Sequence, residues 1–311
     1  MEILFLGTAG TVPTEIRNHP ALIIEYLNEP FLFDCGEGTQ RQMRLANVNP
    51  MQIDHIFITH MHADHILGLA GLIGSIDFMG REKELNIYAP EGFQRIINHI
   101  ISIGAYLPHR FKINVHEANE GVLYTGKGYT ITCAPTEHTG VKSVAYCFCE
   151  NTKRHFLKEK ALELGVPEGK LFSRLQKGHP VEIEVSKKNK IVKKTISPDD
   201  VLGTPIIGRK VVYTGDTKPC GSVIKLAKNC DVLIHDSTFS DEQKDIVEDM
   251  GHSTAKQAAE VALSANVKTL YLTHISQRYT DPEKLEREAR GVFKNSHMAY
   301  DFMRVKVPKH E

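Results

Sequence analysis

The feature that most constrains the fold of this chain is a repeated arrangement in which a short apolar run is followed directly by histidine or aspartate. The strongest case follows the apolar run at residues 53–58 and carries four such side chains, at His60, His62, Asp64 and His65. The run is typical of a β-strand, and residues 66–76 have the pattern of a helix. At this strand-to-helix junction we expect the first two side chains to point one way and the last two another.

Two explanations compete for this cluster. A solvated loop is the ordinary explanation for a lone histidine, but four ligand-type side chains within six positions favour a metal site. Imidazole and carboxylate ligands without a thiolate suit Zn²⁺, and also Mn²⁺ or Fe²⁺. Because closed structural zinc sites rely on cysteine, the mixed set indicates a catalytic site.

Three further residues of the same chemistry stand later in the chain, again after apolar runs. His138 follows the strand-like residues 129–133, and Asp216 and His274 each follow a run of their own. Taken singly, each histidine is more often structural than functional. In α/β folds, however, the chemistry gathers beyond the ends of the strands, where all three stand.

The ordered set resembles the signature of the metallo-β-lactamase superfamily. The resemblance implies an α/β fold in the form of a four-layer αββα sandwich, with two Zn²⁺ ions per subunit, or Mn²⁺ or Fe²⁺ in their place. It further implies that one ion is held by His60, His62 and His138 and the other by Asp64, His65 and His274, with Asp216 bridging both. A two-metal site of this kind can activate a water and neutralise a leaving oxygen.

The rest of the chain alternates between strand-like and helix-like runs. Strands are expected over residues 1–6, 21–26, 31–35, 85–89, 111–115, 121–124, 129–133, 144–149, 210–214, 231–235, 269–273 and 298–305. Helices are expected over residues 39–46, 66–76, 92–102, 221–227, 253–264 and 282–293. Two halves that each pair β-runs with surface helices favour one sheet packed on another with helices outside.

Charge is distributed unevenly although the net charge is zero. Residues 151–195 carry twelve lysines and arginines against five acids, so this segment has a charge of +7. We interpret the chain as a single domain, 1–311, interrupted by this segment as a flexible arm. Most lysine runs are simply solvated, but such asymmetry indicates an anionic partner. Lysine and arginine contacts to phosphates give affinity without reading bases, and the candidates here are Lys153, Arg154, Lys187 and Lys188.

With the arm included, the chain resembles the tRNase Z family of tRNA 3′-processing endonucleases over nearly its whole length. The motifs that carry this resemblance are residues 36–42, 215–217, 251–254 and 274–279. The resemblance implies removal of the 3′ trailer from precursor tRNA near the discriminator base, leaving a 3′-hydroxyl. It also implies a homodimer in which the arm of one subunit grips the tRNA that the other cuts. Glu15 and Lys170 stand where the family commonly has a basic residue and a proline.

The same resemblance assigns roles to individual residues. A water shared by the two metals would attack the phosphorus, with Asp64 as metal ligand and proton acceptor. His252 would contact the scissile phosphate or protonate the departing 3′ oxygen, and a helix-capping histidine is the competing interpretation. Asp236 is expected to orient His252, against the alternative of a structural turn, and Arg278 is a candidate phosphate clamp.

Two other functions remain open at this point. The first is a small-molecule hydrolase of the same fold, such as a phosphodiesterase, an arylsulfatase-like enzyme or a thioesterase. The second is an inactive RNA-binding or scaffold protein, which the intact ligand set disfavours. Six scattered cysteines, an N-terminus that lacks a signal-peptide pattern and the absence of a run of transmembrane length favour a cytoplasmic protein without a membrane partner.

Overall fold

The computed structural model describes residues 1–102, 110–187 and 190–310. The chain divides into two compact units. The larger unit comprises Met1–Glu150 and Arg209–Pro308, and the smaller comprises Asn151–Gly208 and the residues from Lys309 onward.

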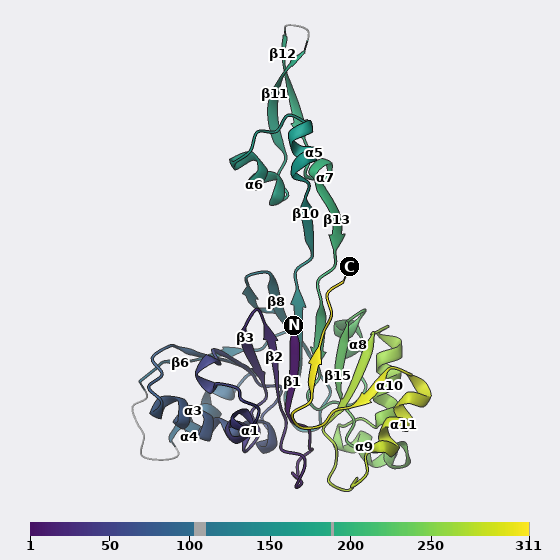
Figure 1. Ribbon diagram of the computed structural model, residues 1–311. Coiled ribbons are helices and arrows are strands. Elements are labelled where there is room, and N and C mark those ends of the chain that lie inside the picture. Colours follow the sequence, from purple (N-terminus) through teal and green to yellow (C-terminus); the bar gives the residue numbers. More distant parts are fainter. Residues whose placement is uncertain (103–109, 188–189, 311) are drawn as a thin grey trace. The chain divides into compact units, whose positions relative to one another are not determined.

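The described part of the larger unit contains two seven-stranded sheets, which can be followed in Figure 1. The first has the order β18-β1-β2-β3-β4-β5-β6, with the bounds Arg304–Lys306, Glu2–Gly7, Ala21–Tyr26, Glu29–Phe33, His55–Phe57, Leu85–Ala89 and Ile113–Glu117. The second has the order β17-β16-β15-β14-β9-β8-β7, with the bounds Ser296–Met298, Thr269–Thr273, Val232–Asp236, Lys210–Tyr213, Val144–Glu150, Tyr129–Pro135 and Gly121–Gly126. Neighbouring strands from β3 to β6 and from β14 to β17 are parallel.

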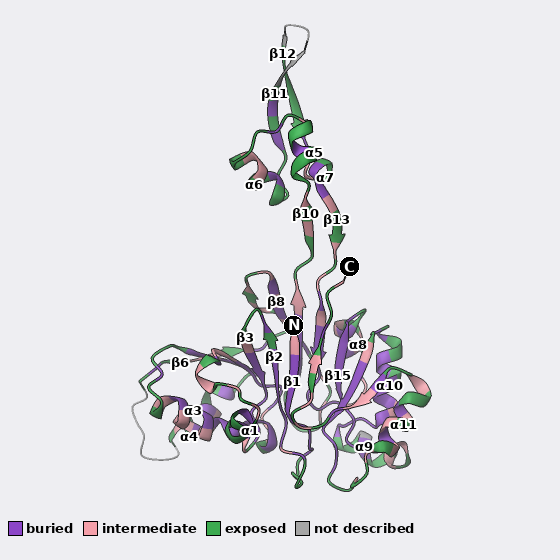
Figure 2. Cartoon of the chain, in the orientation of Figure 1, coloured by how far each residue is buried: buried purple, intermediate pink, exposed green. Residues whose placement is uncertain are grey.

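Alternation along the strands explains the layers, because successive side chains point to opposite faces of a sheet. In β1, Ile3 and Phe5 join the core between the two sheets, whereas Leu4 and Leu6 join a core under helices. The helices over the first sheet are α1 (Thr39–Leu45), α3 (Gly68–Phe78) and α4 (Phe93–Ser102). Those over the second are α8 (Gly221–Ala227), α10 (Ala255–Ser264) and α11 (Glu283–Val292). The predicted four-layer αββα sandwich is confirmed, and Figure 2 shows its buried interior.

Most of the expected elements are present, with one clear error. The strand expected over residues 298–305 is wrong: β17 pairs with β16 in the second sheet, and β18 pairs with β1 in the first. A turn separates them, in which Phe302 has a positive φ of 69° and Asp301 accepts bonds from Thr8 and Asn18. The segment therefore crosses between the sheets.

Several short elements complete the larger unit. The helix expected over residues 66–76 corresponds to α3, which begins at Gly68, and the short α2 (Ala63–Ile66) precedes it. The others are η1 (Pro50–Gln52), η2 (Asp241–Gln243) and α9 (Lys244–Met250). Among the described residues, no helix combines the length and apolar character needed to span a membrane.

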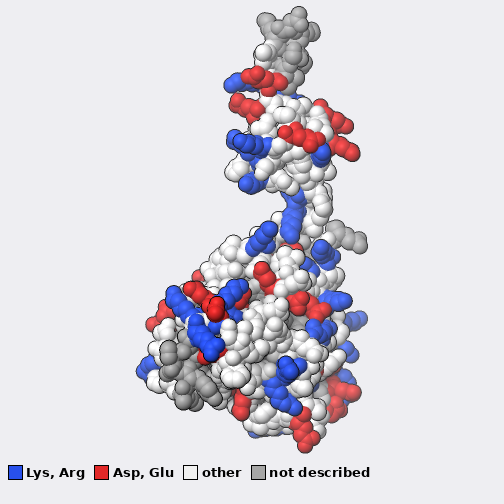
Figure 3. Space-filling model, turned by 60° about the vertical axis from the view of Figure 1, so that its left-hand side comes forward, with Lys and Arg blue, Asp and Glu red and all other residues white. Residues whose placement is uncertain are grey.

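The smaller unit has an apolar core of its own. Its elements are β10 (Lys153–Phe156), α5 (Lys158–Glu163), α6 (Lys170–Gln176), β11 (Val181–Lys187), β12 (Lys190–Ile196), α7 (Pro198–Val201) and β13 (Leu202–Ile206). Ala161, Leu175, Ile183 and Val201 are among the residues that form the core. Pairing of β10 with β13 extends the unit beyond residue 195, and the added acids reduce its charge to +5 for Asn151–Gly208. Charges of both signs are visible on this unit in Figure 3.

Candidate metal centre

The ends of four strands deliver the ligand-type side chains of the larger unit to one place. His60, His62, Asp64 and His65 follow β4, His138 follows β8, Asp216 follows β14 and His274 follows β16. Their metal-binding atoms form two groups, within each of which all atoms lie within 4.8 Å of one another. The structure thus brings together all seven residues that the sequence marked as metal ligands.

The first group contains three histidines and one carboxylate. His62 Nδ1 lies 3.0 Å from His60 Nε2 and 3.0 Å from His138 Nε2. Asp216 Oδ2 lies 3.7 Å from His60 Nε2 and 3.9 Å from His138 Nε2. Burial lowers the pKa of each of the three histidines. They are therefore neutral near pH 7, which is the form in which imidazole binds a metal.

The second group shares the same carboxylate oxygen. Asp216 Oδ2 lies 3.1 Å from His274 Nε2 and 3.3 Å from His65 Nε2. Asp64 Oδ2 lies 3.5 Å and 3.7 Å from the same two nitrogens. Because Asp216 belongs to both groups, a single side chain links the two candidate positions.

The hydrogen bonds around the histidines fix which ring nitrogen faces the cluster. His65 Nδ1 lies 2.8 Å from the Asp34 carboxylate, and His138 Nδ1 lies 2.8 Å from the Gly251 carbonyl. These oxygens only accept, so both Nδ1 atoms carry a proton and both Nε2 atoms face the cluster, where the neutral form of each ring presents a lone pair. The Thr238 hydroxyl donates to Asp236 and therefore accepts from His274 Nδ1, at 2.8 Å, with the same result.

Unpartnered atoms give an independent test of whether a metal fits. Among the described residues, Asp64 Oδ2, His65 Nε2, Asp216 Oδ1 and His274 Nε2 are buried and have no hydrogen-bond partner. A buried polar atom without a partner costs about 1–3 kcal/mol. Coordination would satisfy acceptor atoms of this kind, so the residues present fit a metal-ion site.

Asp34 was missed from the sequence. It follows β3, is fully buried and has a positive φ of 54°. Besides His65, it accepts bonds from the Thr59 backbone and hydroxyl and from Tyr213 Oη at 2.8 Å. The available signal was a carboxylate directly after a strand. Thr238 and Gly251 were also missed. In the structure Gly251 has a φ of +76°, and a Cβ there would lie 2.3 Å from the Thr139 nitrogen.

His252 lies beside the cluster and is held by Asp236. Its Nδ1 is 2.8 Å from Asp236 Oδ2, and its ring stacks on that of His274 with centroids 5.1 Å apart. Asp236 is itself fixed by Thr217 and Thr238. Burial lowers the pKa of His252, but the Asp236 charge and hydrogen bond outweigh burial and raise that pKa to about 9. In this geometry Asp236 orients a protonated His252 next to the ligand groups.

The remaining candidates are not part of the cluster. Arg278 is exposed, and its guanidinium lies over the Phe239 ring at 5.5 Å. Arg154 binds the carbonyls of Leu202 and Gly203 within the smaller unit, where Lys153 lies in the same strand. Lys188 and the side chain of Lys187 lie outside the described residues.

Comparison with known proteins is consistent with this geometry. Two family models match, one described as Anti-Pycsar protein Apyc1 over residues 1–161 and one as a beta-lactamase superfamily domain over residues 174–275. A protein named ribonuclease Z from Methanothermobacter thermautotrophicus is 46% identical over 311 residues, covering 100% of this chain and 98% of the relative. One of the same name from Bacillus subtilis is 39% identical, covering 99% and 100%.

A solved structure agrees with these relatives. The crystal structure of human tRNase Z, short form, is 25% identical, has a TM-score of 0.71 and covers 99% of this chain and 100% of its own. The structure of the metallo-β-lactamase fold protein YhfI from Bacillus subtilis, at 20% identity and a TM-score of 0.69, shares the fold. The full-length relatives, together with the fold, show that this chain belongs to the ribonuclease Z family.

Proposed function

We propose that this protein is a metal-dependent endoribonuclease that removes the 3′ trailer from precursor tRNA near the discriminator base and leaves a 3′-hydroxyl. The observation that carries the proposal is the meeting of seven ligand-type side chains at the strand ends of a full-length member of the ribonuclease Z family. A phosphodiester is a substrate for which two adjacent metal positions are suited.

Two Zn²⁺ ions per subunit fit the donor set best. His60, His62 and His138 would hold one ion, Asp64, His65 and His274 the other, and Asp216 would contact both. Mn²⁺ and Fe²⁺ accept the same nitrogen and oxygen donors. When bound, the ions supply Lewis-acid stabilisation of the phosphate oxygens and lower the pKa of water at the site.

Asp64 is the residue that we assign as proton acceptor. Its carboxylate is largely buried and its Oδ2 has no hydrogen-bond partner among the described residues. Burial raises its pKa, but His274 and His65 outweigh burial and hold the pKa far below the usual range. Asp64 is therefore ionised near pH 7 and can take the proton of an attacking water.

His252 is the residue that we assign as proton donor to the departing 3′ oxygen. Asp236 keeps it protonated and holds its ring by the bond to Nδ1, so that Nε2–H is left to face the substrate. General acids of this kind contribute about 10²–10⁴-fold to the rate. Asp236 acts through His252 and is a positioning residue.

Precursor tRNA is the proposed partner, with the smaller unit as its exosite and a homodimer as the active assembly. The basic side chains of the unit, Lys153 among them, would contact phosphates, which gives affinity that decreases with salt. Arg278 is proposed to clamp a phosphate near the metals. All six cysteines are free, which agrees with a cytoplasmic protein.

The function is tested by measuring cleavage of two substrates in separate assays, a precursor tRNA and a small phosphodiester. We expect the purified protein to cut the precursor once, next to the discriminator base, and to lose this activity with a chelator and regain it with Zn²⁺. A small-molecule hydrolase of the same fold would hydrolyse bis-p-nitrophenyl phosphate well and ignore the tRNA. That result would replace the proposed substrate while leaving the metal site in place.

A further inference from the structure

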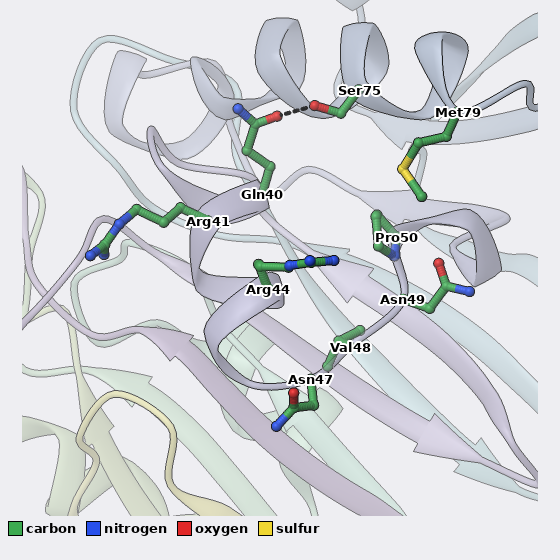
Figure 4. A pocket seen from close by; sticks show the side chains of 9 residues that line it. All are labelled: Gln40, Arg41, Arg44, Asn47, Val48, Asn49, Pro50, Ser75 and Met79. Carbon is green, nitrogen blue, oxygen red and sulfur yellow. Dashed lines mark hydrogen bonds between the residues drawn. The ribbon is translucent and has the colours of Figure 1, made fainter.

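A cavity lies among the helices that cover the first sheet of the larger unit. It has a volume of about 640 Å³ and is formed by α1, the loop after α1 with η1, and the second half of α3 (Figure 4). Cavities of this size are typical of sites for small molecules. None of the seven predicted metal ligands lines it.

The side-chain oxygen atoms of two amides in the cavity wall already accept hydrogen bonds. Asn49 Oδ1 accepts from the Met51 backbone nitrogen at 3.0 Å, and a backbone N–H can only donate. The Ser75 hydroxyl donates to Gln40 Oε1 at 2.6 Å, a bond drawn in Figure 4. The NH₂ groups of Asn49 and Gln40 therefore remain, and both side chains are among those that line the cavity.

Arg44 adds a cation to these donors. Its side chain extends from α1 toward Pro50 in Figure 4, among the residues that line the cavity. Among residues 1–102, 110–187 and 190–310, no carboxylate forms an ion pair with Arg44, and no aspartate or glutamate lines the cavity. A guanidinium beside amide donors, without an acid to neutralise it, is suited to a phosphate.

The opposite part of the wall is apolar. Val48, Pro50 and Met79 line it, and the Met79 side chain is 53% exposed. An apolar wall next to a cationic group can accept the flat base of a nucleotide while the phosphate binds the donors. We propose that this cavity binds a nucleotide unit through its phosphate, with Arg44, Gln40 and Asn49 as the contacts.

The nucleotide can belong to an RNA strand or be a free mononucleotide, since both present the same phosphate. The position of α1 favours a strand. The loop before α1 contains Gly36, where a Cβ would lie 2.3 Å from the Asp64 carbonyl oxygen, so this loop packs directly against the metal centre. RNA that leaves the centre along α1 reaches Arg44 within two helical turns. With an RNA strand as the ligand, the inference rests on the proposed function.

The test is equilibrium binding to the full-length protein, measured by calorimetry without cleavage. The probes are adenosine 5′-monophosphate and a single-stranded oligoribonucleotide that contains no tRNA. We expect Arg44→Gln to weaken binding of at least one probe by about tenfold, as for loss of a charge-assisted hydrogen bond. The matched control is Arg287→Gln, which removes an equal charge from the exposed face of α11 and should leave binding unchanged.

A second pair of variants adds a charge to the wall of the cavity. Met79→Glu places a carboxylate in the wall and should weaken binding, whereas Phe78→Glu places it on a neighbouring side chain that is 84% exposed and does not line the cavity. Binding of the oligoribonucleotide alone assigns the site to an RNA strand, and binding of the mononucleotide as well assigns it to free nucleotides.

Two results would overturn the inference. One is that neither probe binds the parent protein, and the other is that Arg44→Gln and Arg287→Gln bind equally. Failure of the proposed function would look different, because the parent protein would then leave precursor tRNA uncut whatever this cavity binds.

Discussion

Asp216 is the side chain on which both groups of ligand-type residues converge. Burial raises its pKa, but His274 and His65 outweigh burial and hold the pKa well below the usual range. The sequence could predict this residue because the ordered ligand set resembles that of the metallo-β-lactamase superfamily and the residue follows an apolar strand. Asp34 also follows a strand, but its role depends on contacts with His65 and Tyr213 over separations of 31 and 179 positions. Hydrogen bonds that orient ligands depend on how distant strands pair, and no local pattern records them.

The first prediction concerns Asp34 as the residue that orients His65. Asp34→Asn should lower metal affinity by about 10–100-fold, because the amide no longer supports the protonated Nδ1 of His65 as a carboxylate does. Metal titration of the purified variant measures this. Asp241→Asn, which removes a surface carboxylate paired with Lys256, is the control and should bind metal normally. Equal metal affinity in the two variants would contradict the role of Asp34.

The second prediction concerns His252 as proton donor. His252→Ala should slow cleavage by about 10²–10⁴-fold on a normal substrate. A substrate with sulfur in place of the scissile 3′ oxygen should restore most of the lost rate, because a thiolate leaves without needing a proton. Asp64→Ala should stay slow on both substrates, since it lacks the proton acceptor. If His252→Ala is equally impaired on both substrates, His252 does not donate the proton.

At the scale of elements, the strands that precede the metal ligands were predictable, because each is a short apolar run that ends in a polar residue. The segment from Met298 to Val305 was not, because the left-handed turn at Phe302 divides one apolar run between two sheets. β13 was also missed, since it gains its order by pairing with β10, which lies about fifty residues earlier. Both predictions failed because the strands pair with partners that lie far away in the sequence, beyond the reach of a local pattern.

The ends of β9 and β14 carry a polar network with a clear pH dependence. Glu150 accepts bonds from Arg209 Nε at 2.8 Å and from Tyr26 Oη at 2.9 Å. Burial raises the pKa of Glu150, but these partners outweigh burial and lower that pKa from 4.5 to about 2. A lowered pKa means that the ionised form stabilises the fold above the unfolded pKa of 4.5, and that this stability is lost as the pH falls toward 2.

The third prediction follows from this network. Glu150→Gln should lower the free energy of unfolding at neutral pH by roughly 1–3 kcal/mol. The difference from the parent protein should shrink as the pH falls from about 4.5 toward 2, because Glu150 of the unfolded parent binds a proton before Glu150 of the folded parent does. Urea denaturation at several pH values measures it, and Glu283→Gln on the exposed face of α11 is the control. A difference that is constant with pH would contradict the account.

At the scale of the molecule, the smaller unit is inserted between β9 and β14, two neighbouring strands of the second sheet. The Glu150 backbone nitrogen donates to the Arg209 carbonyl at 2.8 Å, and Cys149 pairs with Lys210 in the β9–β14 ladder. The chain therefore leaves and re-enters the larger unit through neighbouring residues. The arm was recognisable from its charge, but its end at residue 208 depends on the β10–β13 pair.

The fourth prediction uses this geometry. Replacing residues 151–208 by a short glycine-containing turn between Glu150 and Arg209 should leave metal content and hydrolysis of bis-p-nitrophenyl phosphate intact. Binding of precursor tRNA should weaken by at least about tenfold and depend less steeply on salt, because phosphate contacts are lost. Unchanged tRNA affinity and an unchanged salt slope would show that the smaller unit is not the exosite.

The measurement that tests the central claim most directly is the sequence of product ends from one precursor tRNA with a long trailer. The account predicts a single internal cut beside the discriminator base, with a 3′-hydroxyl on the tRNA, that disappears in Asp64→Ala and with a chelator. A ladder of products shortened one nucleotide at a time, or an uncut precursor in the presence of added Zn²⁺, would contradict it.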